Sequence, residues 1–288
     1  MKTVVVTGAT SGIGFAVSAE FLKGGCRVIG LGHSEKNCQA AKETLLSVNP
    51  SYDITYLCGD MMQQPEVVRL AGELRRNLEL NSGGQLHALV NNAGCVRSWY
   101  MTTGEGYEQQ FALNHLSGFL LTHELFVNLV KGSGRILFTS SGSHKRMKMN
   151  WQDLMFQKHY RPLFVYKQSK LCNMLTVFEL NDRYSGQGIR AYGIDPGLVR
   201  TEIGHKNTGK LVDFVWKSRS RHGVDPSVPA KVYAELINGE SKAEGLCYGI
   251  GGLVKHSGQV TKQNANRLFE MSEKLCHIRF GVNEECLS

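Results

Sequence analysis

The chain has 288 residues, 42% of them hydrophobic, and a formal net charge of +8 at pH 7. This length suffices for one large α/β domain, and no Pro/Gly/Ser-rich stretch or run of charge suggests a linker, so we expect a single domain over residues 1–288. The basic excess suits a polyanionic ligand or an acidic membrane surface better than nucleic acid, because the cations are dispersed and no nucleic-acid-binding module is recognisable.

The cysteines and the apolar runs bear on the compartment. Eight cysteines are scattered without a C-x-x-C spacing, and no apolar run reaches the ~18–20 residues of a membrane span. The simplest interpretation is buried free thiols in a reducing cytoplasm, without a transmembrane anchor. The ten histidines form no spaced pair with carboxylates or cysteines, so no metal site is expected.

The first predicted strand runs directly into a glycine-rich turn. Residues 2–6 are a short β-branched run, the turn follows with the spacing G-x-x-x-G-x-G, and a helical pattern begins at Phe15. A strand, a glycine turn and a helix N-terminus together can hold an anionic pyrophosphate on backbone N–H groups. An ordinary tight turn is the alternative. The turn contains Gly8, Ser11, Gly12, Ile13 and Gly14.

The later strands end in polar clusters. Because ligands of open α/β sheets bind outside the carboxyl ends of the strands, these clusters predict one site. Strand-like runs alternating with helical patterns as far as residue 194 predict a doubly wound parallel sheet flanked by helices. The strands at 86–90, 134–139 and 189–194 are followed by Asn92, Ala93 and Gly94, by Ser140 and Ser141, and by Asp195, Pro196 and Gly197. Further strands are expected at 27–31 and 54–58, before His33 and Asp60.

Tyr166 and Lys170 stand four residues apart in a predicted helix. One helical turn brings both side chains to the same face. A lysine cation beside a tyrosine favours the phenolate and lowers a phenol pKa that starts near ~10, which is the make-up of a general acid/base. A half-buried tyrosine beside a solvated lysine is the ordinary alternative.

In their order and separation, these motifs resemble the short-chain dehydrogenase/reductase superfamily over roughly residues 3 to 280. The chain is most similar to its retinol dehydrogenase-like branch, including the oxidoreductase domain found next to WW modules, through segments 113–122, 140–144, 169–173 and 267–273. An extended-family epimerase or dehydratase also carries Y-x-x-x-K, but its glycine spacing differs.

The resemblance implies a catalytic set of Asn114, Ser141, Tyr166 and Lys170. Tyr166 exchanges the proton of the substrate oxygen, Lys170 assists it and holds the nicotinamide ribose, and Ser141 binds the substrate oxygen. Asn114 braces the lysine through a water, with a solvated helix asparagine as the alternative. Ser140 competes with Ser141, and the family pattern favours Ser141.

The resemblance also implies a nicotinamide dinucleotide bound along the strand ends. Asp60 meets the adenine, residues 92–94 pack along the adenosine, and Pro196, Gly197, Val199 and Thr201 surround the nicotinamide. NAD-selecting enzymes place a carboxylate after the second strand, whereas this chain has Gly32, His33 and Ser34 there. We therefore favour NADP(H) over NAD(H), with His33 near the 2′-phosphate. The alternative is a surface histidine and use of both cofactors.

Two features depart from the usual pattern. Between Ser141 and Tyr166 lie 24 residues, an insertion at about 142–165 that is rich in large apolar side chains. These could line a hydrophobic substrate pocket or pack the insertion against the domain. Asp195 replaces the histidine usual in the branch. Beyond it, the segment at about 198–222 corresponds to a substrate lid, with a surface helix as the alternative.

The expected function is NAD(P)(H)-dependent interconversion of a hydrophobic alcohol and its ketone or aldehyde, with NADPH-dependent reduction favoured. A catalytically silent dinucleotide-binding sensor or scaffold is the alternative. The expected partner is a small hydrophobic carbonyl or alcohol, and a homo-oligomer is left open.

Overall fold

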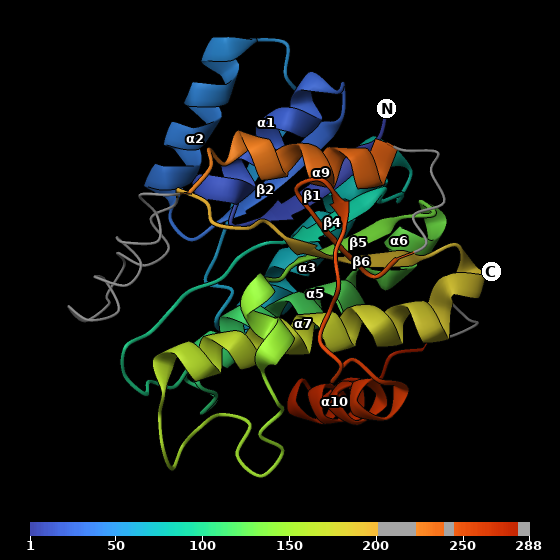
Figure 1. The fold of residues 1–288 in the computed structure, drawn as a ribbon. Helices are drawn as coiled ribbons and strands as arrows, with labels where there is room; N and C mark the ends of the chain where they lie inside the picture. Colours follow the sequence, from blue (N-terminus) through green and yellow to red (C-terminus); the bar gives the residue numbers. More distant parts are fainter. Residues whose placement is uncertain (201–222, 239–244, 282–288) are drawn as a thin grey trace.

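The computed structural model describes residues 1–200, 223–238 and 245–281 (Figure 1). Thr201 and most of the predicted lid lie outside the described residues.

The strands form where aliphatic and β-branched residues cluster. Parallel strands lie between two layers of helices, so both of their faces are apolar, and all five residues of the first strand are buried accordingly. The prediction that a strand precedes each polar cluster is confirmed, with ends shifted by one or two residues. The strands are β1 Thr3–Thr7, β2 Arg27–Gly32, β3 Ile54–Cys58, β4 Ala88–Asn91, β5 Arg135–Thr139, β6 Arg190–Asp195, β7 Cys247–Gly249 and β8 Gly252–Leu253.

These strands form one sheet in the order β3-β2-β1-β4-β5-β6-β7-β8. The pairs from β3 through β7 are parallel, which confirms the predicted doubly wound sheet, and β7 pairs with β8 antiparallel. Strands of three and two residues leave no periodicity in the sequence, so neither β7 nor β8 was predicted. The strand order reverses between β1 and β4, where a doubly wound sheet opens a crevice for a ligand.

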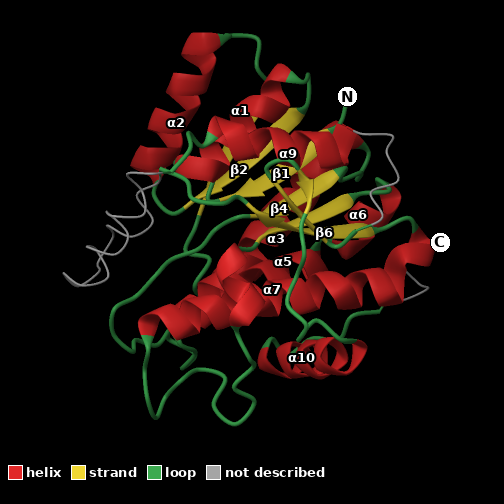
Figure 2. Ribbon diagram, in the orientation of Figure 1, coloured by secondary structure: helices red, strands yellow, loops and turns green. Residues whose placement is uncertain are grey.

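Helices cover both faces of the sheet (Figures 1 and 2). One face carries α1, α2 and α9, and the other carries α3, α5 and α7, with α10 packed outside α7. The first helix begins at Gly12, inside the glycine turn and three residues before the predicted start. The α-helices are α1 Gly12–Lys23, α2 Glu35–Val48, α3 Gln64–Ser82, α4 Gln109–Phe111, α5 Ser117–Glu124, α6 Phe126–Lys131, α7 Pro162–Tyr184, α9 Ser227–Asn238 and α10 Lys262–Leu275; the short segments η1 Ala112–Leu116, η2 Gly142–Arg146 and η3 Ser185–Gln187 complete them.

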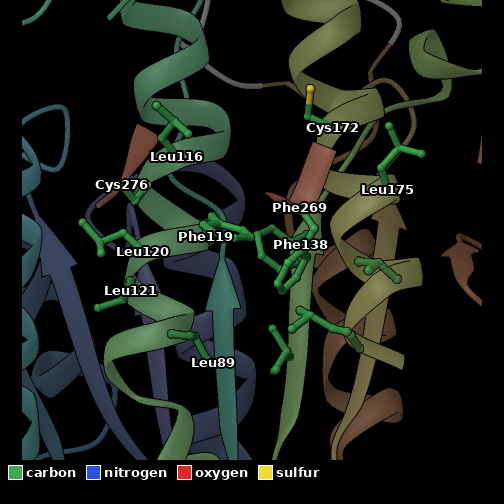
Figure 3. Close-up of a cluster of buried hydrophobic side chains, with 14 of the residues drawn as sticks. Leu89, Leu116, Phe119, Leu120, Leu121, Phe138, Cys172, Leu175, Phe269 and Cys276 are labelled. Carbon is green, nitrogen blue, oxygen red and sulfur yellow. The ribbon is translucent and has the colours of Figure 1, made fainter. Parts of the chain in front are cut away.

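The larger apolar core lies between the sheet and the helices of the second face. Phe119 of α5, Phe138 of β5 and Phe269 of α10 are buried together in it (Figure 3). The rings of Phe119 and Phe269 meet edge to face with centroids 4.9 Å apart. This packing fixes α7 between the sheet and α10, so the helix that carries Tyr166 and Lys170 is held on two sides.

Within the described part of the chain, no helix combines the length and the apolar character needed to cross a bilayer. All eight described strands belong to one sheet. The single-domain organisation over residues 1–288 stays a prediction.

Candidate active site

A cleft of about 780 Å³ opens along the carboxyl ends of the central strands. It brings together nearly all the side chains that the sequence analysis assigned to one site. Asn114 and Gly14 lie behind its wall, and Thr201 lies outside the described residues. The predicted residues that line the cleft are Gly8, Ser11, Gly12, Ile13, His33, Asp60, Asn92, Ala93, Gly94, Ser141, Tyr166, Lys170, Pro196, Gly197 and Val199.

The glycine turn follows β1 and lines the cleft. Gly8 has φ +66°, a left-handed conformation that side chains disfavour, and a Cβ there would lie 3.1 Å from the Ala93 Cα. At Gly14, a Cβ would stand 2.2 Å from the Gly8 carbonyl oxygen and 2.6 Å from the Asn92 amide nitrogen. Gly14 therefore allows α1 to pack against the turn and β4, which directs the N–H groups of the helix start toward the cleft.

Two threonines that the sequence analysis did not assign to the site hold the loop after β4. The Thr7 hydroxyl accepts hydrogen bonds from the backbone N–H groups of Asn92 and Ala93, both at 2.9 Å. The Asn92 amide donates to the Thr7 carbonyl oxygen at 3.1 Å and accepts from the Thr139 hydroxyl at 3.2 Å. The ends of β1, β4 and β5 are thereby tied together. Each threonine is the last residue of its strand. In the sequence, this place at a strand's carboxyl end was the feature that could have indicated a role at the site.

Asn114 lies in a π-helical segment and is 4% exposed. Its side-chain oxygen accepts from the Cys95 N–H at 2.7 Å, and its amide nitrogen donates to the Cys95 carbonyl at 3.0 Å and to the Ser169 hydroxyl at 3.0 Å. The asparagine thus links the loop after β4 to α7. This rules out the alternative of a solvated helix asparagine.

Lys170 is buried beneath Tyr166. Its ammonium lies 5.6 Å from the centre of the Tyr166 ring and donates a 2.9 Å hydrogen bond to the Thr139 carbonyl oxygen. Burial lowers the pKa of Lys170 to about 8, and the nearby Cys95 opposes this shift. Because burial raises the pKa of Cys95 itself to about 12, that thiol is neutral near pH 7. A Cβ at Gly94 would lie 3.6 Å from the Lys170 ammonium nitrogen, so the glycine leaves room for a ligand to approach the lysine.

The two serines after β5 face different partners. Ser140 is 1% exposed and donates its hydroxyl hydrogen to the Lys170 carbonyl oxygen at 3.1 Å. Ser141 is half-buried, and its hydroxyl oxygen accepts from the Ser143 N–H at 3.3 Å, so its own hydrogen is left for a ligand. This geometry favours Ser141 as the group that binds the substrate oxygen.

His144, a residue that the sequence analysis passed over, lies behind Ser141. It is fully buried, and its Nδ1 contacts the Ser141 carbonyl oxygen. Burial lowers its pKa, so the ring is neutral and Nδ1–H donates to that carbonyl. The contact fixes the backbone that carries the candidate substrate-binding hydroxyl.

The residues after β2 and β3 line the cleft beside the glycine turn, because β2 pairs with β1. The His33 side chain is 79% exposed, and its Nδ1 lies 3.7 Å from an Asp60 carboxylate oxygen. A Cβ at Gly32 would meet the Cys38 sulfur at 2.4 Å and a Thr10 methyl carbon at 2.6 Å. A side chain at this strand end, where NAD-selecting proteins carry a carboxylate, would therefore have to displace the side chains of Cys38 and Thr10.

Asp195, at the end of β6, is held by its neighbours. One carboxylate oxygen lies 3.6 Å from the Lys145 ammonium, and the other accepts from the Gly197 N–H at 3.2 Å. The carboxylate that departs from the family pattern is thus paired with a lysine from the insertion and shapes the turn that lines the cleft.

The large apolar residues of the insertion pack into the main core. Met147, Met149, Leu154 and Phe156 are each no more than 8% exposed, and among the residues described, none from 147 to 163 lines the cleft. For these four side chains the burial favours packing of the insertion against the domain over a pocket wall. Within the described part of the predicted lid segment, Leu198 and Val199 line the cleft.

The sheet is open and mostly parallel, and a glycine turn lies at the start of its first helix. A tyrosine–lysine pair lies in the cleft at the strand ends. These features together define a dinucleotide-binding α/β protein. The family model for short chain dehydrogenases matches residues 2–211. The chain therefore belongs to the short-chain dehydrogenase family, as its motifs predicted.

No group of three or more metal-ligating side chains occurs in the described ranges.

Curated relatives place the chain in the retinol dehydrogenase-like branch. Human retinol dehydrogenase 14 is 36% identical over 220 residues, which cover 70% of this chain and 63% of that protein. Mouse retinol dehydrogenase 12 is 33% identical over 217 residues, covering 75% of this chain and 66% of that protein. The chain thus spans slightly less than two thirds of the length of these relatives.

Solved structures share the fold at low sequence identity. An alcohol dehydrogenase from the archaeon Thermococcus sibiricus, complexed with 5-hydroxy-NADP, superposes with a TM-score of 0.68 at 18% identity over 89% of this chain and 98% of that one. A short-chain dehydrogenase from Sphingobium yanoikuyae in complex with NADPH gives a TM-score of 0.65 at 18% identity over 98% of both chains.

Proposed function

We propose that this chain is an NAD(P)(H)-dependent oxidoreductase that interconverts a hydrophobic alcohol and its ketone or aldehyde, working mainly as an NADPH-dependent carbonyl reductase in a reducing cytoplasm. The observation that carries the proposal is the juxtaposition of Ser141, Tyr166 and a buried Lys170 in one cleft with the glycine turn. The names of the retinol dehydrogenase relatives and of the NADPH-bound structure support the reaction class. The seven described cysteines are free, which supports a reducing compartment.

The residues around the cleft fit a dinucleotide. The start of α1 and the glycines at positions 8 and 12 hold the pyrophosphate, residues 92–94 pack along the adenosine, and Pro196, Gly197 and Val199 enclose the nicotinamide end. Asp60 and His33 lie at the adenosine end. When bound, the nicotinamide supplies or accepts the hydride.

The side chains supply the proton chemistry. The Ser141 hydroxyl donates to the substrate oxygen and holds it within reach of the Tyr166 hydroxyl. Tyr166 gives its proton to the carbonyl oxygen in reduction and takes it back in oxidation. The Lys170 cation stabilises the phenolate that remains and binds the nicotinamide ribose, while Asn114 positions the loop after β4 against α7. The neutral His144 keeps the Ser141 backbone in place.

NADP(H) is favoured over NAD(H) because the end of β2 offers no carboxylate. The ribose 2′-OH of NAD is ordinarily bound by an acid there, and that acid repels a 2′-phosphate. His33 is exposed at the cleft edge and can bind a phosphate more weakly than an arginine would. The Asp60 carboxylate lies 3.7 Å from the His33 imidazole, at the same end of the cleft.

The experiment that tests the function is steady-state turnover of a panel of hydrophobic ketones, aldehydes and alcohols with NADPH and NADH. Carbonyl reduction with NADPH is the expected result. Dinucleotide binding without turnover of any member of the panel would instead favour the silent sensor.

A further inference from the structure

Two cysteines lie together beside the end of β2. We propose that Cys38 and Cys58 are a reversible disulfide-forming pair, and that closing this disulfide weakens dinucleotide binding at the adenosine end of the cleft. The effect on binding rests on the proposed function, whereas formation of the disulfide does not.

The sheet register brings the two sulfurs together. Gly32 of β2 is the parallel partner of Cys58 of β3, so the side-chain position of Gly32 lies on the same face of the sheet as Cys58, about 4.8 Å away. Gly32 has no side chain, and the Cys38 sulfur fills that space from the first turns of α2, 2.4 Å from where a Cβ would stand. The Cys38 thiol therefore occupies the cross-strand neighbour position of Cys58.

The protonation equilibria of the two thiols support this contact. Burial raises the pKa of Cys38 to about 11, and the Cys58 thiol adds to the increase. Burial also raises the pKa of Cys58, whereas a hydrogen bond from Cys38 lowers it. Cys58 is the less buried of the two. It is therefore the thiol that meets an oxidant first, and Cys38 is the resolving thiol.

Oxidised glutathione is a sufficient oxidant. The Cys58 thiolate attacks one sulfur of glutathione disulfide, forms a mixed disulfide and releases one glutathione thiolate. The Cys38 thiol then loses its proton to solvent and attacks the Cys58 sulfur, which releases the second glutathione. Two protein thiols are oxidised and one glutathione disulfide is reduced to two thiols. Because both pKa values are raised, the reaction is slow at neutral pH and accelerates as the pH increases.

The link to binding follows from what joins the pair to the cleft. Gly32 and His33 line the adenosine end, and Ser34 caps α2 by accepting from the Asn37 N–H at 3.3 Å. A covalent bond from Cys38 to β3 pulls the first turns of α2 toward the sheet and displaces this short connection. By linkage, a dinucleotide that binds the reduced form better must also protect the pair from oxidation.

The test incubates the full chain with oxidised glutathione at mildly alkaline pH, maps disulfide-linked peptides by mass spectrometry and titrates NADPH by fluorescence. We expect a Cys38–Cys58 linked peptide, a rise in the NADPH Kd of about 5-fold or more, reversal by dithiothreitol, and slower oxidation when NADPH is present. Cys58→Ser should abolish both the link and the change in Kd. Cys26→Ser, a control at a buried cysteine that keeps both thiols of the pair, should preserve them.

Each contrary result would reject a different part of the proposal. Complete oxidation without a Cys38–Cys58 peptide would overturn the pair, and a linked peptide with an unchanged NADPH Kd would overturn its effect on binding. If the reduced protein binds no dinucleotide at all, the proposed function fails, and the peptide map still decides whether the pair forms.

Discussion

The Lys170 ammonium donates a 2.9 Å hydrogen bond to the carbonyl oxygen of Thr139, the last residue of β5. This bond fixes the lysine of α7 to the sheet edge from which Ser141 emerges two residues later. The same carbonyl lies 3.4 Å from the Asn173 amide nitrogen, one turn further along α7. Two side chains of α7 thereby set the position of this helix relative to the strand end that leads to Ser141.

The first prediction concerns the acid/base. Tyr166→Phe keeps the ring and removes only the hydroxyl, so kcat should fall by about 10²–10⁴-fold while NADPH still binds. Tyr184→Phe, at the far end of the same helix, is the matched control and should keep its turnover. Near-normal kcat in Tyr166→Phe would remove Tyr166 from the mechanism.

The second prediction separates the roles of Lys170. Lys170→Met removes a charge and the proposed ribose contact together, so both kcat and NADPH affinity should fall. Isothermal titration of NADPH, alongside turnover, measures the two effects. Lost turnover with unchanged NADPH affinity would contradict the ribose role.

The third prediction is the pH dependence of stability in the free protein. Burial lowers the pKa of Lys170 from 10.5 to about 8. Between these values the unfolded chain keeps the proton that the folded chain has released, so Lys170 makes the free energy of unfolding increase with pH across this window. Below about pH 8 both states are protonated, and the full cost of burying the cation applies.

Urea denaturation of wild type and Lys170→Met at several pH values from 8 to 10.5 measures this effect. All other titrating groups are present in both proteins, so their contributions to the pH dependence of the free energy of unfolding largely cancel in the difference between wild type and variant. The stability of wild type relative to the variant should rise with pH, and a difference that stays constant would show that burial does not perturb this lysine.

The fourth prediction is cofactor choice. Wild type should have the higher kcat/KM with NADPH, and His33→Asp should lower that value by about tenfold or more and raise the value with NADH, because a carboxylate repels the 2′-phosphate. The exposed position 33 suits this substitution, whereas a side chain at Gly32 would collide with Cys38. A higher kcat/KM with NADH than with NADPH in wild type would contradict the NADP(H) assignment.

The fifth prediction concerns the insertion. Met149→Ala and Leu154→Ala remove buried core side chains and should each lower the free energy of unfolding by about 2–5 kcal/mol, with little change in KM across the substrate panel. Gln152→Ala, at an exposed position of the same segment, is the control. Unchanged stability with altered substrate choice would restore the pocket-wall interpretation.

The sequence by itself determined the fold class and the composition of the candidate site. The β-branched runs gave the strands, and the polar residues at their ends converge because carboxyl ends of parallel strands share one edge of a sheet. The pairing of Tyr166 with Lys170 follows from one helical turn, which is a local property of the chain.

Only the tertiary structure decided which neighbours these residues have. The geometry that favours Ser141 over Ser140 depends on the Lys170 carbonyl, 30 residues from Ser140. The burial of Met147, Met149, Leu154 and Phe156 depends on the core that the insertion packs against. The contact of Cys38 with Cys58 required the register of β2 against β3 and the missing side chain of Gly32. Periodicity and motif spacing record local geometry, whereas these contacts arise from close packing of segments distant in sequence, so they become visible only when the whole core is assembled.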